Sequence, residues 1–588
     1  MTFRSIIENY FMAKLANFNK LLVSCTRFVY SIDYLNIQIM TFNTLYEIVK
    51  HSVEKFANRI AFSMIGGEDV SYKEVGERVE KVQDMLLNAG VGAGDKVAIL
   101  SSSMPNWGVS YFAVTSAGMV AVPILPDFTG AELDLIIEHS EAKAILVSDK
   151  LYTKLSKNTI EKMNIVIRTK GLNIISQRVE ERAEAKIPQP EDLAVIIYTS
   201  GTTSKPKGVM LSHYNIAAQT TIIPPLFDYN EEDVLLSILP LAHTYECTLG
   251  MIYPFSRGAR IHYLDRPPTA AALMPALATI RPTVIASVPL IMEKIYRSKV
   301  LPTFQKNAMM RKLYSWDWSR KLLHKVAGGK LKKLFGGRMR FFAIGGAKFD
   351  SDAERFLHEG GFPYGIGYGL TETAPLLAGA VTSMTRIGST GPALPAVQIR
   401  LDNINPETKQ GEIVAKTPCC MMGYYKNEAA TREAFTEDGW FRTGDLGYIS
   451  EDGWIYIKGR LKNMIVGPSG ENIYPEDIEE VLNSNRFVAE SVVTEEDGKL
   501  IALVHFDTTA LEEAYDEFKH KVAVNAEQAQ LKMEEIKREV LEYVNSKVNR
   551  FSKITKVVDN EGEFEKTPTK KIRRYNLLNK KKDKKSDK

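Results

Sequence analysis

The chain contains a run of glycine, hydroxyl and lysine side chains of the kind that surrounds phosphate groups. Residues 198–208 read Tyr-Thr-Ser-Gly-Thr-Thr-Ser-Lys-Pro-Lys-Gly, after a strand expected over residues 193–197 and before a helix start at Ser212. Glycine lets backbone N–H groups turn toward an anion, the hydroxyls donate further hydrogen bonds, and lysine adds positive charge. The spacing differs from the Walker loop, and a flexible surface loop has a similar composition. The run alone therefore leaves two interpretations open, a nucleotide site and a plain loop.

A second group of residues suits a magnesium ion and a flat ligand. Glu372 stands between two threonines in the motif of residues 368–373. Mg²⁺ takes few protein carboxylates and fills its shell with phosphate oxygens and water. Gly345 and Gly346 follow a strand expected over residues 339–344, where glycine allows a ligand to approach the backbone closely. Taken alone, Glu372 is also typical of an exposed surface, and the two glycines are typical of a turn.

Three further motifs lie in the last third of the chain. Asp445 is placed in a glycine-bounded loop, and an ionised carboxylate can accept hydrogen bonds from both hydroxyls of a ribose. A basic turn over residues 457–463 contains Arg460 and Lys462, and Lys571 lies just after a Pro-Thr turn. Singly, these motifs are typical of a turn aspartate and of solvated basic surfaces.

Together, and in this order, the motifs resemble the signature set of the acyl-adenylate-forming superfamily over nearly all of residues 40–578. Residues 240–246 (Pro-Leu-Ala-His-Thr-Tyr-Glu) and 568–571 (Pro-Thr-Lys-Lys) are most similar to long-chain fatty acyl-CoA synthetases. Many members have glycine where this chain has Lys570, and alignment of the flanking residues favours Lys571 as the functional lysine. The resemblance implies an α/β fold. A large N-terminal domain of α/β layered subdomains plus a small β-rich subdomain would be followed by a small mobile α+β C-terminal domain.

The resemblance also implies a role for each motif. The residues implied in ATP binding are Thr199, Ser200, Gly201, Thr202, Thr203 and Lys207 for the phosphates, Gly345, Gly346, Ala347, Tyr368 and Gly369 for the adenine, and Asp445 and Arg460 for the ribose. Thr371 would contact the α-phosphate, and Glu372, with Thr199, would bind Mg²⁺. Lys462 would be a hinge, and Lys571 would reach the carboxylate and the α-phosphate. His243 would lie beside the acyl and adenylate sites, or would be a structural histidine.

The motifs lie at the ends of elements that alternate between strand and helix, which predicts βαβ units in a mostly parallel sheet. Helices are expected over residues 45–56, 72–89, 107–117 and 129–139, and strands over residues 96–100, 120–123, 144–147, 284–288 and 339–344. Short strands over residues 397–401, 411–414 and 454–457 indicate a small β-rich subdomain. A charged stretch over residues 511–548 indicates surface helices.

Four segments are expected along the chain: an extension over residues 1–39, an AMP-binding domain over 40–460, a C-terminal domain over 461–578 and a basic tail over 579–588. The extension mixes apolar and charged residues and lacks the form of a secretory signal. Met40 is favoured as the physiological start, and an amphipathic surface helix is the alternative. The tail is expected to be solvated and disordered, with weak attraction to an anionic membrane surface as the alternative.

Composition indicates a large protein of ordinary charge. The chain has 588 residues, of which 45% are hydrophobic and 25% charged, and its net charge of +4 gives no basis for binding nucleic acid. The cysteines show neither metal spacing nor a disulfide framework, which favours a reducing cytoplasm; they are Cys25, Cys247, Cys419 and Cys420. No run is apolar and long enough to span a bilayer. A peripheral position at the inner face of the membrane and a homodimer are both left open.

We therefore expect the chain to activate a fatty acid, with long chains favoured. ATP and Mg²⁺ would give acyl-AMP with release of pyrophosphate, and transfer to the thiol of CoA would give acyl-CoA. An apolar and long acyl pocket is expected; residues 220–227 and 376–384 are candidate stretches for it, and the sequence assigns no single residue to its lining. The alternatives are transfer to a carrier-protein phosphopantetheine, an aryl or amino acid as substrate, and a non-catalytic nucleotide-binding protein.

Overall fold

The computed structural model describes most of the chain from residue 41 onward. The described residues are 41–179, 181–199, 206–264, 266–381, 383–466, 472–496, 498–519, 526–560, 562–566 and 572–574. The predictions for the extension, for Ser200 to Thr203, for Lys571 and for the basic tail lie outside these residues.

One mixed sheet carries the first predicted motif at the end of a central strand. Its strands, in spatial order, are β18 (Gly423–Tyr424), β9 (Lys207–Ser212), β8 (Leu193–Thr199), β4 (Val120–Pro123), β3 (Lys96–Leu100), β5 (Ala142–Val147), β6 (Ile165–Arg168) and β7 (Asn173–Gln177). From β8 to β6 neighbouring strands are parallel, and their runs of Val, Ile and Ala are buried. The antiparallel strands β9 and β7 flank this parallel centre.

A second mixed sheet carries the motifs of residues 345–373. Its strands, in spatial order, are β15 (Leu376–Val381), β14 (Tyr364–Gly369), β13 (Phe341–Ile344), β12 (Val284–Ser287), β10 (Val234–Ser237), β11 (Arg260–Tyr263), β1 (Ile60–Met64) and β2 (Asp69–Ser71). Leu236, Ile285, Phe342 and Ile344 lie in one apolar cluster with residues of the helices α11 (Ala270–Ile280), α12 (Pro289–Ile295), α15 (Asp317–Leu334) and α16 (Ser351–Glu359). These helices therefore cover one face of the sheet.

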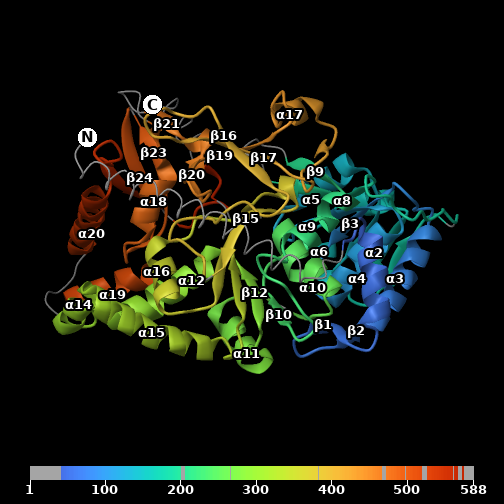
Figure 1. The fold of residues 1–588 in the computed structure, drawn as a ribbon, viewed down its shortest axis with the longest axis horizontal. Coiled ribbons are helices and arrows are strands. Elements are labelled where there is room, and N and C mark those ends of the chain that lie inside the picture. Colours follow the sequence, from blue (N-terminus) through green and yellow to red (C-terminus); the bar gives the residue numbers. More distant parts are fainter. Residues whose placement is uncertain are drawn as a thin grey trace, which may run out of the picture.

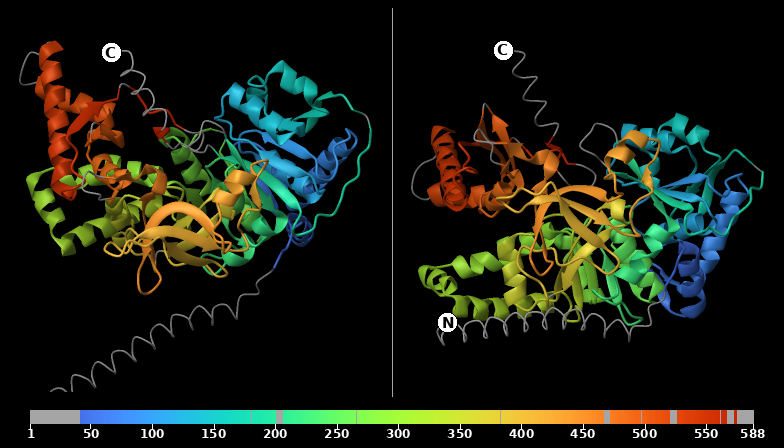
Figure 2. Two further views of the ribbon diagram at one scale, coloured as in Figure 1. Left: turned by 90° about the horizontal axis from the view of Figure 1, so that it is seen from above. Right: turned by 45° about the horizontal axis from the view of Figure 1, so that its top comes forward.

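The last part of the chain forms smaller sheets. The antiparallel four-stranded sheet consists of β16 (Gln398–Asp402), β17 (Gly411–Lys416), β19 (Phe441–Ile449) and β20 (Ile455–Arg460). After it come β21 (Ile465–Val466), β22 (Asn472–Ile473), α18 (Pro475–Asn483), β23 (Val488–Glu496), β24 (Lys499–Phe506), α19 (Thr508–Lys519), α20 (Ala526–Lys547) and β25 (Lys556–Asp559). Figures 1 and 2 show α18, β23, β24 and α20 gathered at the opposite end of the molecule from α2–α4.

The predicted helices agree with the structure to within a few residues. The remaining helices are α2 (Leu45–Lys55), α3 (Tyr72–Leu87), α4 (Pro105–Ser116), α5 (Gly130–Ser140), α6 (Asp149–Tyr152), α7 (Lys157–Lys162), α8 (His213–Ala217), α9 (Gln219–Ile222), η1 (Glu246–Ile252), α10 (Tyr253–Ser256), η2 (Tyr296–Val300), α13 (Leu301–Gln305), α14 (Ala308–Ser315), η3 (Thr371–Thr373), α17 (Glu428–Glu433) and η4 (Leu461–Asn463). The predicted α/β class, with a large N-terminal part, a small β-rich part and a smaller α+β part, is confirmed. The prediction of a mostly parallel sheet is incomplete, since the fold has two mixed sheets with antiparallel edges.

Candidate active site

The glycine- and threonine-rich run connects β8 to β9, and these two strands pair in antiparallel fashion. Thr199 is the register partner of Lys207, and its hydroxyl lies 3.5 Å from the Lys207 carbonyl oxygen. The sequence was expected to pass from the loop to the helix at Ser212, but the strand β9 runs between them. Ser212 is nevertheless the predicted helix start, because its hydroxyl accepts a hydrogen bond from the Asn215 backbone N–H at 3.1 Å. Of the predicted phosphate ligands, the structure describes Thr199 and Lys207.

Glu372 is connected to this hairpin through a tyrosine that sequence analysis missed. The Tyr424 hydroxyl donates to the Glu372 carboxylate at 2.9 Å, and the Lys207 ammonium lies 4.9 Å from the centre of the Tyr424 ring. The backbone reinforces the connection, since Met421 N–H donates to the Glu372 carbonyl at 2.8 Å. Burial, followed by the Glu372 carboxylate, raises the pKa of Tyr424, so the phenol remains a donor at neutral pH. A lone tyrosine after a glycine is a weak signal that single-sequence analysis does not select.

Tyr368, Asp445 and Arg460 form a second polar group. The Tyr368 hydroxyl donates to one Asp445 oxygen at 2.8 Å, and the Arg460 Nε lies 2.7 Å from the other. Asp445 and Arg460 face each other on β19 and β20, so the sheet register brings them together. Asp445 is buried, so these contacts hold its carboxylate away from solvent. Arg460 is therefore directed at the Asp445 carboxylate rather than standing apart from it, and the two residues predicted to hold a ribose lie together.

Two different structural constraints favour glycine at the positions near the predicted adenine pocket. At Gly345, before Gly346 and Ala347, an added Cβ would lie 3.4 Å from both the Tyr245 ring and the Gly367 carbonyl oxygen, and Gly346 has φ +87°. These positions allow close approach to the backbone. At Gly369 an added Cβ would lie 1.8 Å from the Pro375 carbonyl oxygen, so packing of the chain against itself already demands glycine there.

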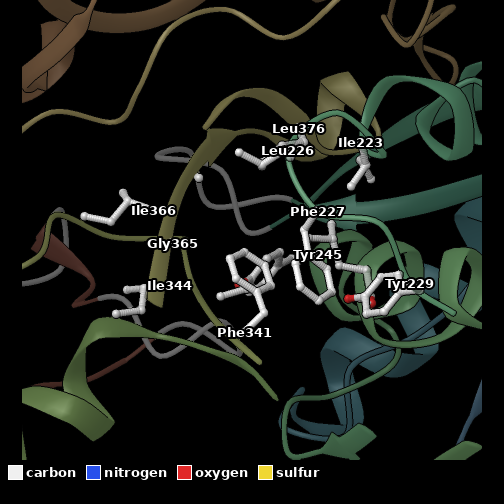
Figure 3. Close-up of a pocket in the computed structure, with 13 residues that line it drawn as sticks. Ile223, Leu226, Phe227, Tyr229, Tyr245, Phe341, Ile344, Gly365, Ile366 and Leu376 are labelled. Atoms are coloured by element: carbon white, nitrogen blue, oxygen red, sulfur yellow. The ribbon is translucent and has the colours of Figure 1, made fainter. Parts of the chain in front are cut away.

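An apolar pocket adjoins these glycines (Figure 3). Both stretches in which the acyl pocket was expected contribute to it, and the residues lining it are Ile223, Leu226, Phe227, Tyr229, Tyr245, Leu249, Phe341, Ala343, Ile344, Gly365, Ile366, Gly367 and Leu376. Among these described residues none carries a charge. Tyr245 and Gly367 also lie beside Gly345, so one end of the pocket lies next to the predicted adenine motif. His243 is half-buried two residues before Tyr245.

The part of the chain after β20 is anchored next to the same motif. Lys462 is exposed in η4, directly after β20. One residue after Ala347, the Lys348 ammonium lies 2.5 Å from Asp477 and 2.7 Å from Glu480, both on α18. The ion pairs therefore hold α18 close to the glycines that follow β13.

A hairpin near the C-terminus also contacts the large part of the molecule. Lys566 and Ile572 form an antiparallel bridge, so residues 567–571, with Lys571, connect two paired chain segments. On the return segment, Arg573 Nη2 lies 2.9 Å from the Glu132 carboxylate in the first turn of α5. Burial acts to raise the pKa of Glu132, but the Thr129 backbone N–H and then Arg573 outweigh it, so the pKa lies below its usual value. Glu132 is therefore ionised at neutral pH, and the pair is a true ion pair.

The arrangement has the chemical groups that a nucleotide requires. Asp445 offers an acceptor for a ribose, and the β8–β9 hairpin with Lys207 offers cationic charge for phosphates. Among the described residues, no three or more His, Cys, Asp or Glu side chains gather into a group that could hold a metal ion. Mg²⁺ bound beside nucleotide phosphates needs only one or two protein carboxylates. In the described part of the chain, no helix combines the length and apolar character needed to cross a membrane.

Comparison with known proteins agrees with this geometry. The sequence profile of the AMP-binding enzyme family matches residues 49–425. The long-chain-fatty-acid–CoA ligase FadD15 of Mycobacterium bovis is 29% identical over 486 residues, 76% of this chain and 78% of that protein. The peroxisomal long chain acyl-CoA synthetase 6 of Arabidopsis thaliana is 28% identical over 528 residues, 80% of this chain and 74% of that protein.

Solved structures share the fold. ATP-bound MatB from Rhodopseudomonas palustris superimposes with a TM-score of 0.72 at 24% identity, covering 92% of this chain and 99% of that one. The o-succinylbenzoate CoA synthetase MenE from Bacillus subtilis, in complex with its acyl-adenylate intermediate, superimposes with a TM-score of 0.70 at 22% identity, covering 90% of this chain and 97% of that one. At these identities the similarity establishes the architecture.

Proposed function

We propose that this chain, which belongs to the AMP-binding enzyme family, is an ATP-dependent fatty acid:CoA ligase that favours long chains. In the first step the substrate carboxylate attacks the α-phosphorus of ATP, forming acyl-AMP and releasing pyrophosphate. In the second step the thiol of CoA, losing its proton, attacks the acyl carbon, forming the thioester and releasing AMP. The observation that carries the proposal is the uncharged apolar pocket whose lining residues Tyr245 and Gly367 lie beside Gly345 of the predicted adenine motif.

The first step needs charge stabilisation rather than a general base. A carboxylate is already a nucleophile, so the enzyme must overcome repulsion between two anions and stabilise the oxygens around phosphorus. Asp445 would hold the ribose, Lys207 and the hairpin after Thr199 would hold the phosphates, and Glu372 would hold Mg²⁺. When bound, the magnesium ion would neutralise phosphate charge. Tyr424 keeps the Glu372 carboxylate oriented toward the β8–β9 hairpin.

Lys571 would serve only the first step. A fixed cation beside the reacting phosphate is typically worth about 3–4 kcal/mol, so its loss slows that step by roughly a few hundredfold or more. In the second step the same side chain would obstruct the incoming thiol, and rotation of the segment after Lys462 would remove it. We expect Lys571→Ala to lose acyl-AMP formation and still convert supplied acyl-AMP to thioester. Equal loss of both steps would contradict this division of labour.

The substrate class rests on the chemistry of the pocket. Each buried methylene contributes about 0.8 kcal/mol, so an uncharged apolar lining favours an aliphatic substrate over a polar or charged one. An amino acid would require a buried carboxylate for its ammonium group, and the described lining residues include none. The named relatives at 29% and 28% identity are long-chain ligases, which supports the same class. Transfer to a carrier-protein phosphopantetheine is the alternative for the second step.

One experiment tests the proposal directly. Pyrophosphate release is measured with carboxylates from acetate to oleate, each without thiol, with CoA and with a phosphopantetheinylated carrier protein. We expect release to rise with chain length and CoA to be the better acceptor. Gly367→Val narrows the pocket, because a Cβ there meets the flexible end of Leu376 at 2.8 Å, and should shift the optimum to shorter chains. Hydrolysis of ATP solely to ADP would exclude the whole scheme.

A further inference from the structure

Helix α15 carries a stripe of large apolar side chains on its solvent face. Trp318, Leu322 and Val326 follow one another at four-residue spacing, which places them on one side of the helix. Their exposed fractions are 66%, 58% and 57%. Isolated exposed apolar residues are ordinary on protein surfaces, whereas a continuous row on one helix face marks an interaction surface.

The opposite face of α15 fixes the orientation of this stripe. Arg320 forms an ion pair with Glu359 at the end of α16 at 2.9 Å, and the buried His324 ring places Nδ1 2.7 Å from the same carboxylate. An added Cβ at Gly328 would lie 2.3 Å from the Gly360 carbonyl oxygen, so the helix packs against the backbone there. Because the inner face is held by these contacts, the stripe cannot turn inward without breaking them. Figure 1 shows α14 and α15 along the outer edge of the molecule.

The stripe continues from α15 toward α14. The Trp316 and Trp318 rings stack with centroids 6.3 Å apart, and the Lys312 ammonium lies 6.0 Å from the Trp316 ring. Met309, on α14, is 68% exposed. We call the surface formed by Met309, Trp316, Trp318, Leu322 and Val326 the α14–α15 face.

Positive charge is concentrated around this face. Residues 306–334 contain nine Lys and Arg residues and a single acidic residue, in a chain whose total net charge is only +4. The acidic residue, Asp317, is already paired with Arg320. Exposed lysines border the stripe; they are Lys321, Lys325, Lys330, Lys332 and Lys333. Within the part of the chain that the structure describes, no acidic side chain forms an ion pair with them.

We propose that the α14–α15 face docks on an anionic lipid bilayer. Tryptophan places its ring at the boundary between headgroups and acyl chains, lysines bring their ammonium groups to the headgroups, and an apolar stripe flanked by lysines is the pattern of a helix lying in that boundary. Protein interfaces, in contrast, are depleted in lysine, and a second copy would bring like charges together. The face contains no residue of the nucleotide site, so the inference goes beyond the proposed function and is tested without any activity.

Vesicle binding by the full chain is the first test. Sedimentation with phosphatidylcholine vesicles is compared with vesicles that also contain phosphatidylglycerol, at low and high salt. We expect salt-sensitive binding to the anionic vesicles alone. Trp318→Ser/Leu322→Ser and Lys321→Glu/Lys325→Glu should each weaken it about tenfold or more, since every basic residue near the surface contributes measurably. The matched controls are Ile187→Ser/Leu531→Ser, at 60% and 66% exposed positions, and Lys50→Glu/Lys553→Glu, and they should bind as the parent does.

Tryptophan emission locates the contact. Trp316 and Trp318 are exposed, whereas Trp107 and Trp454 are buried and Trp440 is half-buried. Brominated phosphatidylcholine in the anionic vesicles should quench the emission of the parent and not that of Trp316→Phe/Trp318→Phe. Circular dichroism confirms that each variant is folded.

Three outcomes would overturn the proposal. In the first, the variants of the α14–α15 face bind vesicles as tightly as the parent, and only a variant ending at residue 578 loses binding. That result would assign vesicle binding to the basic tail. In the second, vesicles bind without quenching. In the third, Trp318→Ser/Leu322→Ser changes the sedimentation coefficient without lipid and leaves vesicle binding intact, so that the face joins two copies of the chain.

Discussion

The ion pair between Arg573 and Glu132 offers the sharpest test of how the C-terminal hairpin is used. Arg573 lies two residues after Lys571, and Glu132 lies on α5 of the large N-terminal part. The pair therefore fixes the hairpin against the part of the molecule that carries the nucleotide motifs. We expect Arg573→Ala to weaken acyl-AMP formation and to spare thioester formation from supplied acyl-AMP, because the proposed function assigns Lys571, two residues earlier, to the first step alone.

The magnitude follows from the burial of the two side chains. They are 29% and 24% exposed, with Arg573 Nη2 2.9 Å from Glu132 Oε1. Fully exposed pairs contribute about 0.2–1 kcal/mol, and hydrogen bonds to charged groups in more buried settings about 1.5–3 kcal/mol. A value of about 1–2 kcal/mol between these limits lowers the rate of acyl-AMP formation by about 5–30-fold.

The assay separates the two steps and includes its own controls. Pyrophosphate release reports the first step in a single turnover, and conversion of synthetic acyl-AMP with CoA reports the second. Arg573→Glu should be worse than Arg573→Ala in the first step, and Glu132→Arg combined with Arg573→Glu should recover part of the loss. Arg538→Glu, at an exposed position on α20, is the matched control. Glu132 variants also lose the hydrogen bonds that the Glu132 carboxylate accepts from the Thr129 backbone N–H and hydroxyl, so their thermal stability is recorded alongside.

Two results would refute the reasoning. If Arg573→Ala slows both steps equally, the pair supports folding rather than one arrangement of the hairpin. If the swapped double variant is no better than the worse single variant, the two charges do not act on each other during the reaction.

Three further predictions each concern one carboxylate side chain. Glu372→Gln should lower the rate of acyl-AMP formation by about a hundredfold and raise the Mg²⁺ concentration needed for half-maximal rate. An unchanged dependence of the rate on Mg²⁺ would show that Glu372 does not bind the ion. Asp445→Asn should raise KM for ATP by about 10–100-fold with a smaller change in kcat, as initial rates will show, because it loses the ionised ribose acceptor and its pairing with Arg460. Burial raises the pKa of Glu246 to about 8, whereas a glutamate in the unfolded chain has a pKa of about 4.3. Between these two pH values the folded state therefore binds one proton more than the unfolded state. The free energy of unfolding should therefore fall by up to about 1.4 kcal/mol per pH unit across this range. Glu246→Gln should remove this slope in urea titrations at several pH values, and a slope equal to that of the parent would show that Glu246 is ionised when folded.

Local sequence was sufficient to predict several elements of each part of the chain. The strand over residues 96–100 and the helix beginning at residue 45 agree with β3 and α2 because alternation of apolar residues and capping by Thr44 act over a few neighbours. The strand β9 was missed, because its alternation is short and it follows directly on a run that is typical of a loop. Its pairing with β8 is a contact that local propensity does not encode.

The order of the motifs along the chain determined the family, since each motif is a short string whose chemistry is written in consecutive residues. Tertiary structure alone decided which side chains meet. Tyr424 reaches Glu372 across 52 residues and Arg573 reaches Glu132 across 441, while the register of β19 and β20 joins Arg460 to Asp445. It also decided that the row from Trp318 to Val326 faces solvent, since the contacts of the opposite face of α15 with Glu359 and Gly360 fix the rotation of the helix. Such contacts depend on how sheets and helices pack, and that packing is a property of the whole chain.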